Sequence, residues 1–135
     1  MTTAVDSAVL IDVFQAEPAW AARSADALDA ASRAGRVTVC DVVWAEVAGR
    51  FASPSAAAAA LSTLDIEFDP MTALAAADAG RLWRAFRDAG GGRRERIVAD
   101  FMVGAHALHH ADALLTRDRG FYRRYFKRLR IIEPG

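Results

Sequence analysis

The chain has 135 residues, of which 53% are hydrophobic and 25% are charged. This composition suits one globular domain and excludes an intrinsically disordered chain. The formal net charge of zero conceals an asymmetry, because residues 1–90 hold 7 basic and 12 acidic side chains whereas residues 91–135 hold 10 and 5. The basic part could provide a local positive surface for a phosphate backbone, or it could simply be solvated.

The only cysteine is Cys40, so neither an intrachain disulfide nor a cysteine-based zinc site is expected. The N-terminus lacks the basic and apolar regions of a signal peptide, and no apolar run reaches about 18 residues. We therefore expect a cytoplasmic protein that neither spans nor binds a membrane.

Strands and helices alternate along the first half of the chain. The pattern predicts a strand at 2–5, a helix at 7–14, a helix from Pro18 to near Gly35, a strand at 36–40, a helix capped by Asp41, an alanine-rich helix opened by Ser53, and a strand at 64–68. Each strand is followed by a helix, which is the order of an α/β protein.

The second half continues this alternation. Apolar residues recur at helical spacing from Ala75 to Phe86, and the glycine run at 90–92 is a loop that lacks the Lys-Ser/Thr of a phosphate-binding loop. A helix at 97–110, a strand at 113–116, a turn or short helix at 120–122 and a last strand at 129–132 follow. We predict a single domain over residues 1–135, with three α/β/α layers and a central, mostly parallel sheet of four to five strands.

Four carboxylates lie where predicted strands end or helices begin: Asp6, Glu46, Asp100 and Asp118. Such points converge in space, because open α/β sheets bind ligands outside the carboxyl ends of their strands. Two like charges about 4 Å apart repel by roughly 4 kcal/mol at an effective dielectric constant of 20. The cluster must therefore hold protons or a hard metal ion with oxygen ligands. If Asp6 were considered alone, we would interpret it as a helix cap. Four acids at such positions make a metal-binding site the better interpretation.

Other polar residues have simpler readings. We expect Asp12 to be a solvated helix position and Asp112 a loop residue. His106 and His110 stand four residues apart, which is the spacing of metal ligands on one helix face, but no glutamate follows His106 in the zinc-protease pattern. We therefore favour packed or surface histidines, with His109 among them. The large aromatics are expected in the core, namely Phe14, Trp20, Trp44, Phe51 and Trp83.

Four stretches that span the chain resemble the PIN-domain ribonucleases, specifically VapC-like toxins. They are AVDSAVLID at 4–12, VWAEV at 43–47, RIVADFMVGAHA at 96–107 and LLTRDRGFY at 114–122, of which the last two are the more specific. One departure is Ala8, where the family often has a polar residue, commonly asparagine.

The resemblance implies that Asp6, Glu46, Asp100 and Asp118 are the acidic residues that bind Mg²⁺ or Mn²⁺, and that Thr116 helps to orient the site. The expected activity is cleavage of RNA by metal-activated water, leaving 5′-phosphate and 3′-hydroxyl ends. The chain would be the toxin of a toxin–antitoxin pair, with a small antitoxin as partner and a homodimer as its assembly. The candidates for binding the RNA backbone are Arg93, Arg94, Arg96, Arg117 and Arg119.

Two other functions stay open. A catalytically silent PIN fold could serve as an RNA-binding or scaffold module, although all four acids are present. A metal-dependent phosphatase or DNA nuclease would use the same kind of acidic cluster.

Overall fold

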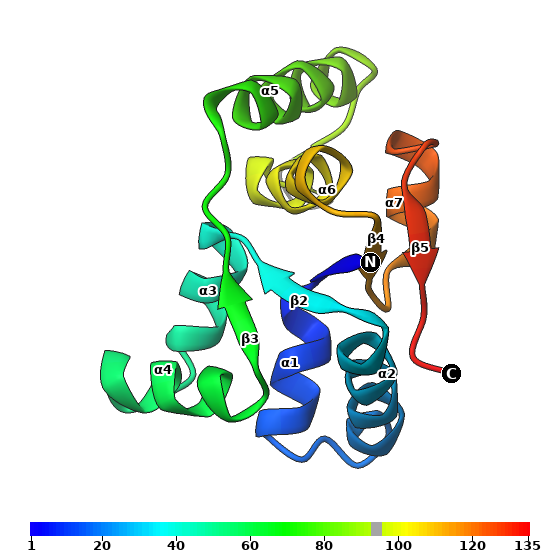
Figure 1. Ribbon diagram of the computed structural model, residues 1–135. Coiled ribbons are helices and arrows are strands. Elements are labelled where there is room, and N and C mark those ends of the chain that lie inside the picture. Colours follow the sequence, from blue (N-terminus) through cyan, green and yellow to red (C-terminus); the bar gives the residue numbers. More distant parts are fainter. Residues whose placement is uncertain (93–95) are drawn as a thin grey trace.

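A five-stranded sheet forms the centre of the computed structural model, which describes residues 1–92 and 96–135 (Figure 1). All pairings between neighbouring strands are parallel, and the strand order is β3-β2-β1-β4-β5. The strands are β1 (Thr2–Val5), β2 (Arg36–Val39), β3 (Ile66–Phe68), β4 (Ala113–Leu115) and β5 (Arg130–Ile132). The predicted parallel sheet in an α/β/α arrangement is thus confirmed.

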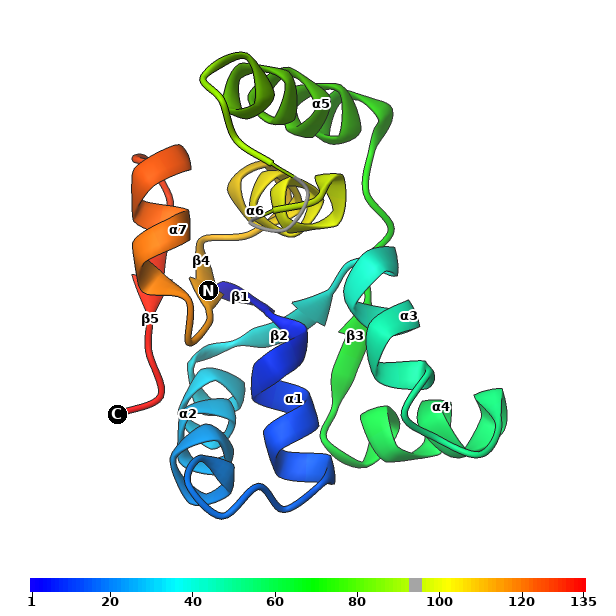
Figure 2. The same cartoon turned by 180° about the vertical axis from the view of Figure 1, so that it is seen from behind.

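Helices cover both faces of this sheet. They are α1 (Ser7–Phe14), α2 (Ala21–Ala34), α3 (Asp41–Ala48), α4 (Pro54–Thr63), α5 (Ala73–Asp88), α6 (Val98–His110) and α7 (Arg119–Tyr125). Figures 1 and 2 show α1 and α2 on one face and α6 on the other, with α5 lying outside α6. Among the residues that the structure describes, none of these helices has the length and apolar character needed to cross a membrane.

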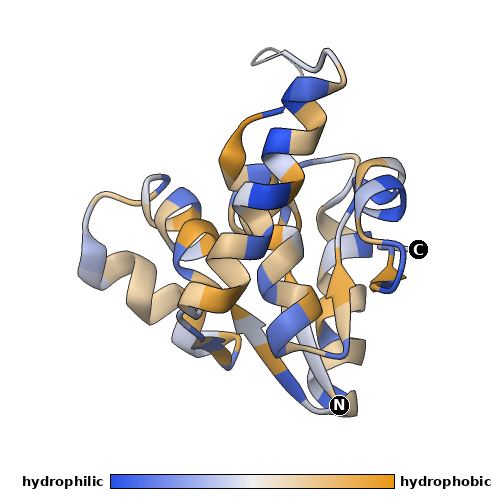
Figure 3. Cartoon of the chain, turned by 90° about the horizontal axis from the view of Figure 1, so that it is seen from above, coloured by the Kyte–Doolittle hydropathy of each residue, from blue (hydrophilic) through white to orange (hydrophobic). Residues whose placement is uncertain are grey.

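The central strands are buried along most of their length, as expected when helices cover both faces of a sheet. The last three residues of β1 and β2 and all three of β4 are buried, whereas β3 and β5 at the edges are largely exposed or half-buried. Figure 3 shows hydrophobic residues in the interior strands and hydrophilic residues mainly on helices and loops. The core between the layers includes Leu10, Phe101 and Phe126, each at most 2% exposed.

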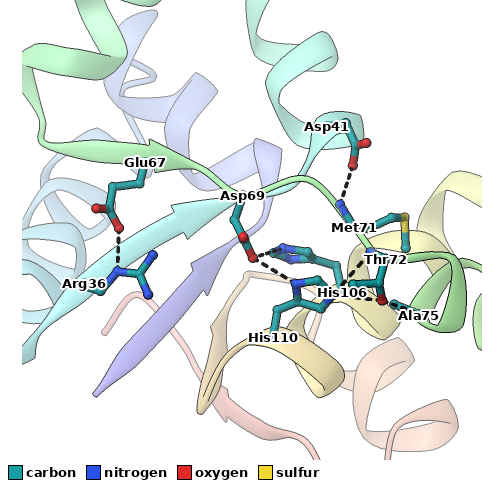
Figure 4. A network of polar contacts seen from close by, with 9 residues as sticks. All are labelled: Arg36, Asp41, Glu67, Asp69, Met71, Thr72, Ala75, His106 and His110. Atoms are coloured by element: carbon teal, nitrogen blue, oxygen red, sulfur yellow. Dashed lines mark hydrogen bonds and ion pairs between the residues drawn. The ribbon is translucent and has the colours of Figure 1, made fainter.

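Two local expectations are corrected. Asp41 was expected to cap α3, but it is the first helical residue, and Cys40 precedes it without a side-chain cap. The Asp41 carboxylate instead accepts a hydrogen bond from the backbone N–H of Met71 at 3.4 Å (Figure 4).

The large aromatics were expected in the core, but all five are only half-buried. Phe14, Trp44, Phe51 and Trp83 pack against the core from its periphery, whereas the Trp20 ring lies against the guanidinium groups of Arg23 and Arg117. The aromatic rings of the core are instead Phe86, Phe101, Phe121, Tyr122 and Phe126.

Candidate active site

The carboxyl ends of β1 and β4 lie side by side at the centre of the sheet. Val5, the last residue of β1, is in register with Leu115, the last residue of β4, and the N–H of Asp6 donates to the Leu115 carbonyl at 2.9 Å. β2 and β3 lie on one side of β1, and β4 and β5 lie on its other side. The strand order therefore reverses between β1 and β4. Such switch points are where open α/β sheets bind ligands.

Thr116 joins two of the candidate acids. Its hydroxyl donates to Asp6 Oδ2 at 2.7 Å and accepts the backbone N–H of Asp118 at 3.0 Å. Asp6 also caps α1, because its Oδ1 accepts the N–H of Ser7 at 2.9 Å. The Thr116 side chain is fully buried, so these contacts fix the turn that follows β4.

Arg96 links Asp118 to Asp100. Its Nη1 lies 2.7 Å from Asp118 Oδ2 and 3.9 Å from Asp100 Oδ1, and its guanidinium carbon lies 4.1 Å from the centre of the Phe121 ring. Asp100 sits in the first turn of α6, where its second oxygen accepts the N–H of Ile97 at 2.9 Å. A cation therefore already lies between two candidate carboxylates.

The carboxylates influence one another electrostatically. Burial raises the pKa of Asp6, hydrogen bonds from Thr116 and Ser7 oppose this, and the charges of Asp118 and Asp100 add to the increase. The pKa of Glu46 on α3 is raised by its partial burial and then by the charges of Asp6 and Asp100. Glu46 thus faces the same site from a third helix.

Tyr122 is a residue of this site that the sequence did not single out. It is 3% exposed, and burial followed by the charges of Asp6, Asp100 and Asp118 raises the pKa of its phenol well above 10.0. In the sequence it was simply an aromatic residue after a glycine. Its burial on α7, within range of the charges of Asp6, Asp100 and Asp118, associates it with the site.

The donor chemistry of this site fits a hard divalent cation. All four candidate ligands are carboxylates, which suit Mg²⁺ or Mn²⁺. Burial first and the charges of neighbouring acids second raise the pKa values of Asp6 and Glu46, and a cation would offset that negative charge. In the described part of the chain, however, the three ligand atoms found within 4.8 Å of one another belong to Asp69, His106 and His110. The acids would have to draw closer to share one ion.

The candidate RNA-binding arginines have different surroundings. Arg93 and Arg94 lie outside the described residues. Arg119 pairs with Glu133 at 2.9 Å, and both side chains are exposed.

Arg117 pairs with Asp12, which corrects the expectation that Asp12 is solvated. The Asp12 side chain is 3% exposed, and Arg117 Nε lies 3.0 Å from its Oδ2. Asp112 is the exposed loop residue that was expected, and its Oδ2 accepts the N–H of Thr2 at 2.7 Å.

Comparisons with known proteins agree with this fold. The sequence profile of the PIN domain family matches residues 3–127, and the chain belongs to this family. A search of curated proteins found no match.

Several solved structures share the fold at low sequence identity. The VapBC2 complex of Rickettsia felis bound to a promoter DNA fragment matches with a TM-score of 0.74 and 15% identity, covering 98% of each chain. The DNA-bound VapBC of Salmonella typhimurium matches with a TM-score of 0.73 and 15% identity, covering 100% of this chain and 99% of that one. A toxin–antitoxin complex from Klebsiella pneumoniae matches with a TM-score of 0.65 and 20% identity, covering 98% of each chain.

Proposed function

We propose that this PIN-domain protein is a divalent-metal-dependent endoribonuclease. The observation that carries the proposal is the Thr116 hydroxyl, which links Asp6 at the end of β1 to Asp118 after β4 at the switch point of the sheet. Asp100 and Glu46 face the same point from α6 and α3. Asp6, Glu46, Asp100 and Asp118 would hold Mg²⁺ or Mn²⁺, which when bound activates water and offsets charge on the phosphate undergoing cleavage.

The protein groups have separable tasks in this proposal. Thr116 holds the Asp6 carboxylate next to the turn that carries Asp118, and the buried phenol of Tyr122 would limit the access of water to the acids. Arg96 is 29% exposed and pairs with Asp118 and Asp100, so it would release these carboxylates to the metal before its charge contacted the phosphate backbone of the substrate. Arg117 and Arg119 would have to leave Asp12 and Glu133 before they could bind a phosphate.

We further propose that the protein is the toxin of a toxin–antitoxin pair. Its fold is shared with chains of VapBC complexes over nearly their whole length. The partner would be a small antitoxin, and the toxin would assemble as a homodimer. Expression should slow growth of the host, and coexpression of a short reading frame next to the gene should restore it. Unimpaired growth with active enzyme would contradict the toxin role alone.

The nuclease proposal is tested with purified protein and RNA, DNA and phosphomonoester substrates offered side by side. RNA should be cleaved with Mg²⁺ or Mn²⁺, and EDTA should stop the reaction. Asp100→Asn should lower the rate by about 100-fold or more, since metal ligands contribute several kcal/mol to catalysis. Asp88→Asn on α5 is the matched control, because its carboxylate is exposed and pairs with Arg84 at 3.6 Å.

Two outcomes would replace this proposal. Preference for DNA or phosphomonoesters would identify a different hydrolase that uses the same acids. RNA binding without cleavage, unaffected by divalent ions, would favour the catalytically silent scaffold.

A further inference from the structure

Three possible metal ligands meet outside the carboxylate site. Asp69 follows β3, and His106 and His110 lie one turn apart on α6 (Figure 4). Asp69 Oδ2 lies 2.9 Å from His106 Nε2 and 3.0 Å from His110 Nδ1. Both imidazoles thus direct a nitrogen at the same carboxylate oxygen.

The spacing of these atoms is close to that of a metal centre. All three ligand atoms lie within 4.8 Å of one another, and the two imidazole rings are 4.7 Å apart and inclined by 30°. A tetrahedral zinc ion with ligands at about 2.0–2.1 Å separates its donor atoms by roughly 3.3 Å. The two contacts of Asp69 would lengthen by a few tenths of an ångström, and the widest separation among the three atoms would close by up to about 1.5 Å, so side-chain rotations must accompany the binding of an ion.

Neighbouring groups hold the ligands in place and leave one side accessible. The backbone N–H of Thr72 donates to His110 Nε2 at 3.4 Å, and the Thr72 hydroxyl lies 3.3 Å from the same nitrogen. A metal on Nδ1 would move the ring proton to Nε2, where the Thr72 hydroxyl can accept it. The backbone N–H of Asp69 donates to the Val39 carbonyl at 2.8 Å. The His106 side chain is 1% exposed, whereas those of His110 and Asp69 are 13% and 29% exposed, so an ion and a water ligand could enter from that side.

We propose that Asp69, His106 and His110 form a binding site for one Zn²⁺ ion or a similar divalent transition metal. The donor set of two imidazole nitrogens and one carboxylate oxygen suits zinc, nickel or cobalt better than magnesium. The ion joins the connection between β3 and α5 to α6. This site is separate from the acidic site, because His106 lies six residues beyond Asp100, or about 9 Å along the helix axis.

The site is tested by titrating the purified protein with Zn²⁺ in excess Mg²⁺, and with Co²⁺ followed by visible absorption. Wild type should bind one equivalent and melt at a higher temperature with zinc. His110→Ala should weaken binding by more than about 100-fold, since it removes a direct ligand. His109→Ala is the matched control, because this neighbouring imidazole contacts Asp78 at 3.0 Å and lies outside the cluster.

Two further variants make the result decisive. Asp69→Asn should weaken zinc binding as His110→Ala does, and circular dichroism should show that both variants are folded. Asp100→Asn should bind zinc like wild type, which separates this proposal from the nuclease site. Absent binding in wild type, unchanged binding in folded His110→Ala, or loss in Asp100→Asn would each overturn the site and leave a purely hydrogen-bonded cluster.

Discussion

Arg117 and Asp12 form a two-pronged ion pair beneath the candidate active site. Arg117 Nε lies 3.0 Å from one oxygen of Asp12 and Nη2 lies 3.1 Å from the other, while the Ser24 hydroxyl donates to Asp12 at 3.1 Å. The Arg117 guanidinium also lies 4.6 Å from the centre of the Trp20 ring. This cluster ties α1 and α2 to the segment after β4, which carries Thr116.

Arg117→Ala should destabilise the fold, because it leaves the buried Asp12 carboxylate with Ser24 alone. We expect a loss of about 3 kcal/mol, the lower end for a broken buried pair, since Arg117 is 31% exposed. Urea denaturation should show it as a lower midpoint, and the double variant Asp12→Asn/Arg117→Ala should lose less than Arg117→Ala alone.

The control for this pair is Arg33→Ala. Arg33 contacts Asp29 at 2.8 Å on the surface of α2, with both side chains largely exposed, so its loss should amount to about 0.5 kcal/mol or less. Equal losses for Arg117→Ala and Arg33→Ala would contradict a structural role for the Asp12 pair.

Thr116→Val keeps the shape of the side chain but removes the hydroxyl between Asp6 and Asp118. Two buried polar groups then lose a partner, so stability should fall by about 1–3 kcal/mol. Under the nuclease proposal, the rate of RNA cleavage should fall as well. Thr116→Ser retains the hydroxyl and should keep most of both properties; a Ser variant as impaired as the Val variant would show that the methyl group, not the hydrogen bonds, matters.

The sequence predicted the fold well because local and long-range signals agree in this chain. The predicted strand at 2–5 and helix at 7–14 match β1 and α1, and Ser53 caps α4 by accepting the N–H of Ala56 at 3.1 Å. Most other boundaries differ by a few residues, as fraying ends do. The alternation of strands and helices predicted parallel strands, because a helix between two strands brings the chain back to start the second strand in the same direction.

The details of the site were less accessible to sequence reasoning, because they depend on which side chains meet across the sheet. The burial of Asp12 could not be inferred, since its partner Arg117 is 105 residues away. The contact of Asp69 with His106 likewise spans 37 residues, although the four-residue spacing from His106 to His110 signalled a shared helix face. The assignment of the acids to a metal remains a prediction.

Asp78 should make stability depend on acid pH. A hydrogen bond from His109 is the main cause of its lowered pKa, burial opposes this, and Arg81 adds to the lowering. A carboxylate with a lowered pKa in the folded state stabilises the protein above its unfolded value of 3.8, and this stabilisation disappears as the pH falls through the folded value.

Asp78→Asn should therefore lower the melting temperature at pH 7, corresponding to about 1 kcal/mol or less because Arg81 is largely exposed. The difference in melting temperature between Asp78→Asn and wild type should shrink as the pH is lowered below 3.8. Melting curves recorded from pH 7 to below pH 3.8 measure this difference. Asp88→Asn is the control, and its melting temperature should stay close to that of wild type at every pH. A difference that grows in acid would contradict the assigned direction.

Glu46→Gln should stabilise the protein when divalent ions are absent. Partial burial and then the charges of Asp6 and Asp100 raise the pKa of Glu46, so removing its charge relieves desolvation and repulsion within the site. Because Glu46 is exposed, the gain in EDTA should be small, about 1–3 °C in melting temperature.

Magnesium should reverse this order, since wild type retains one more ligand and gains more from the ion than Glu46→Gln does. Melting curves in EDTA and in millimolar Mg²⁺ measure both effects. Glu133→Gln removes an equally exposed glutamate that pairs with Arg119, and its melting temperature should not rise in EDTA. If Glu46→Gln behaves like Glu133→Gln in both solutions, then Glu46 does not share a cation with the other acids.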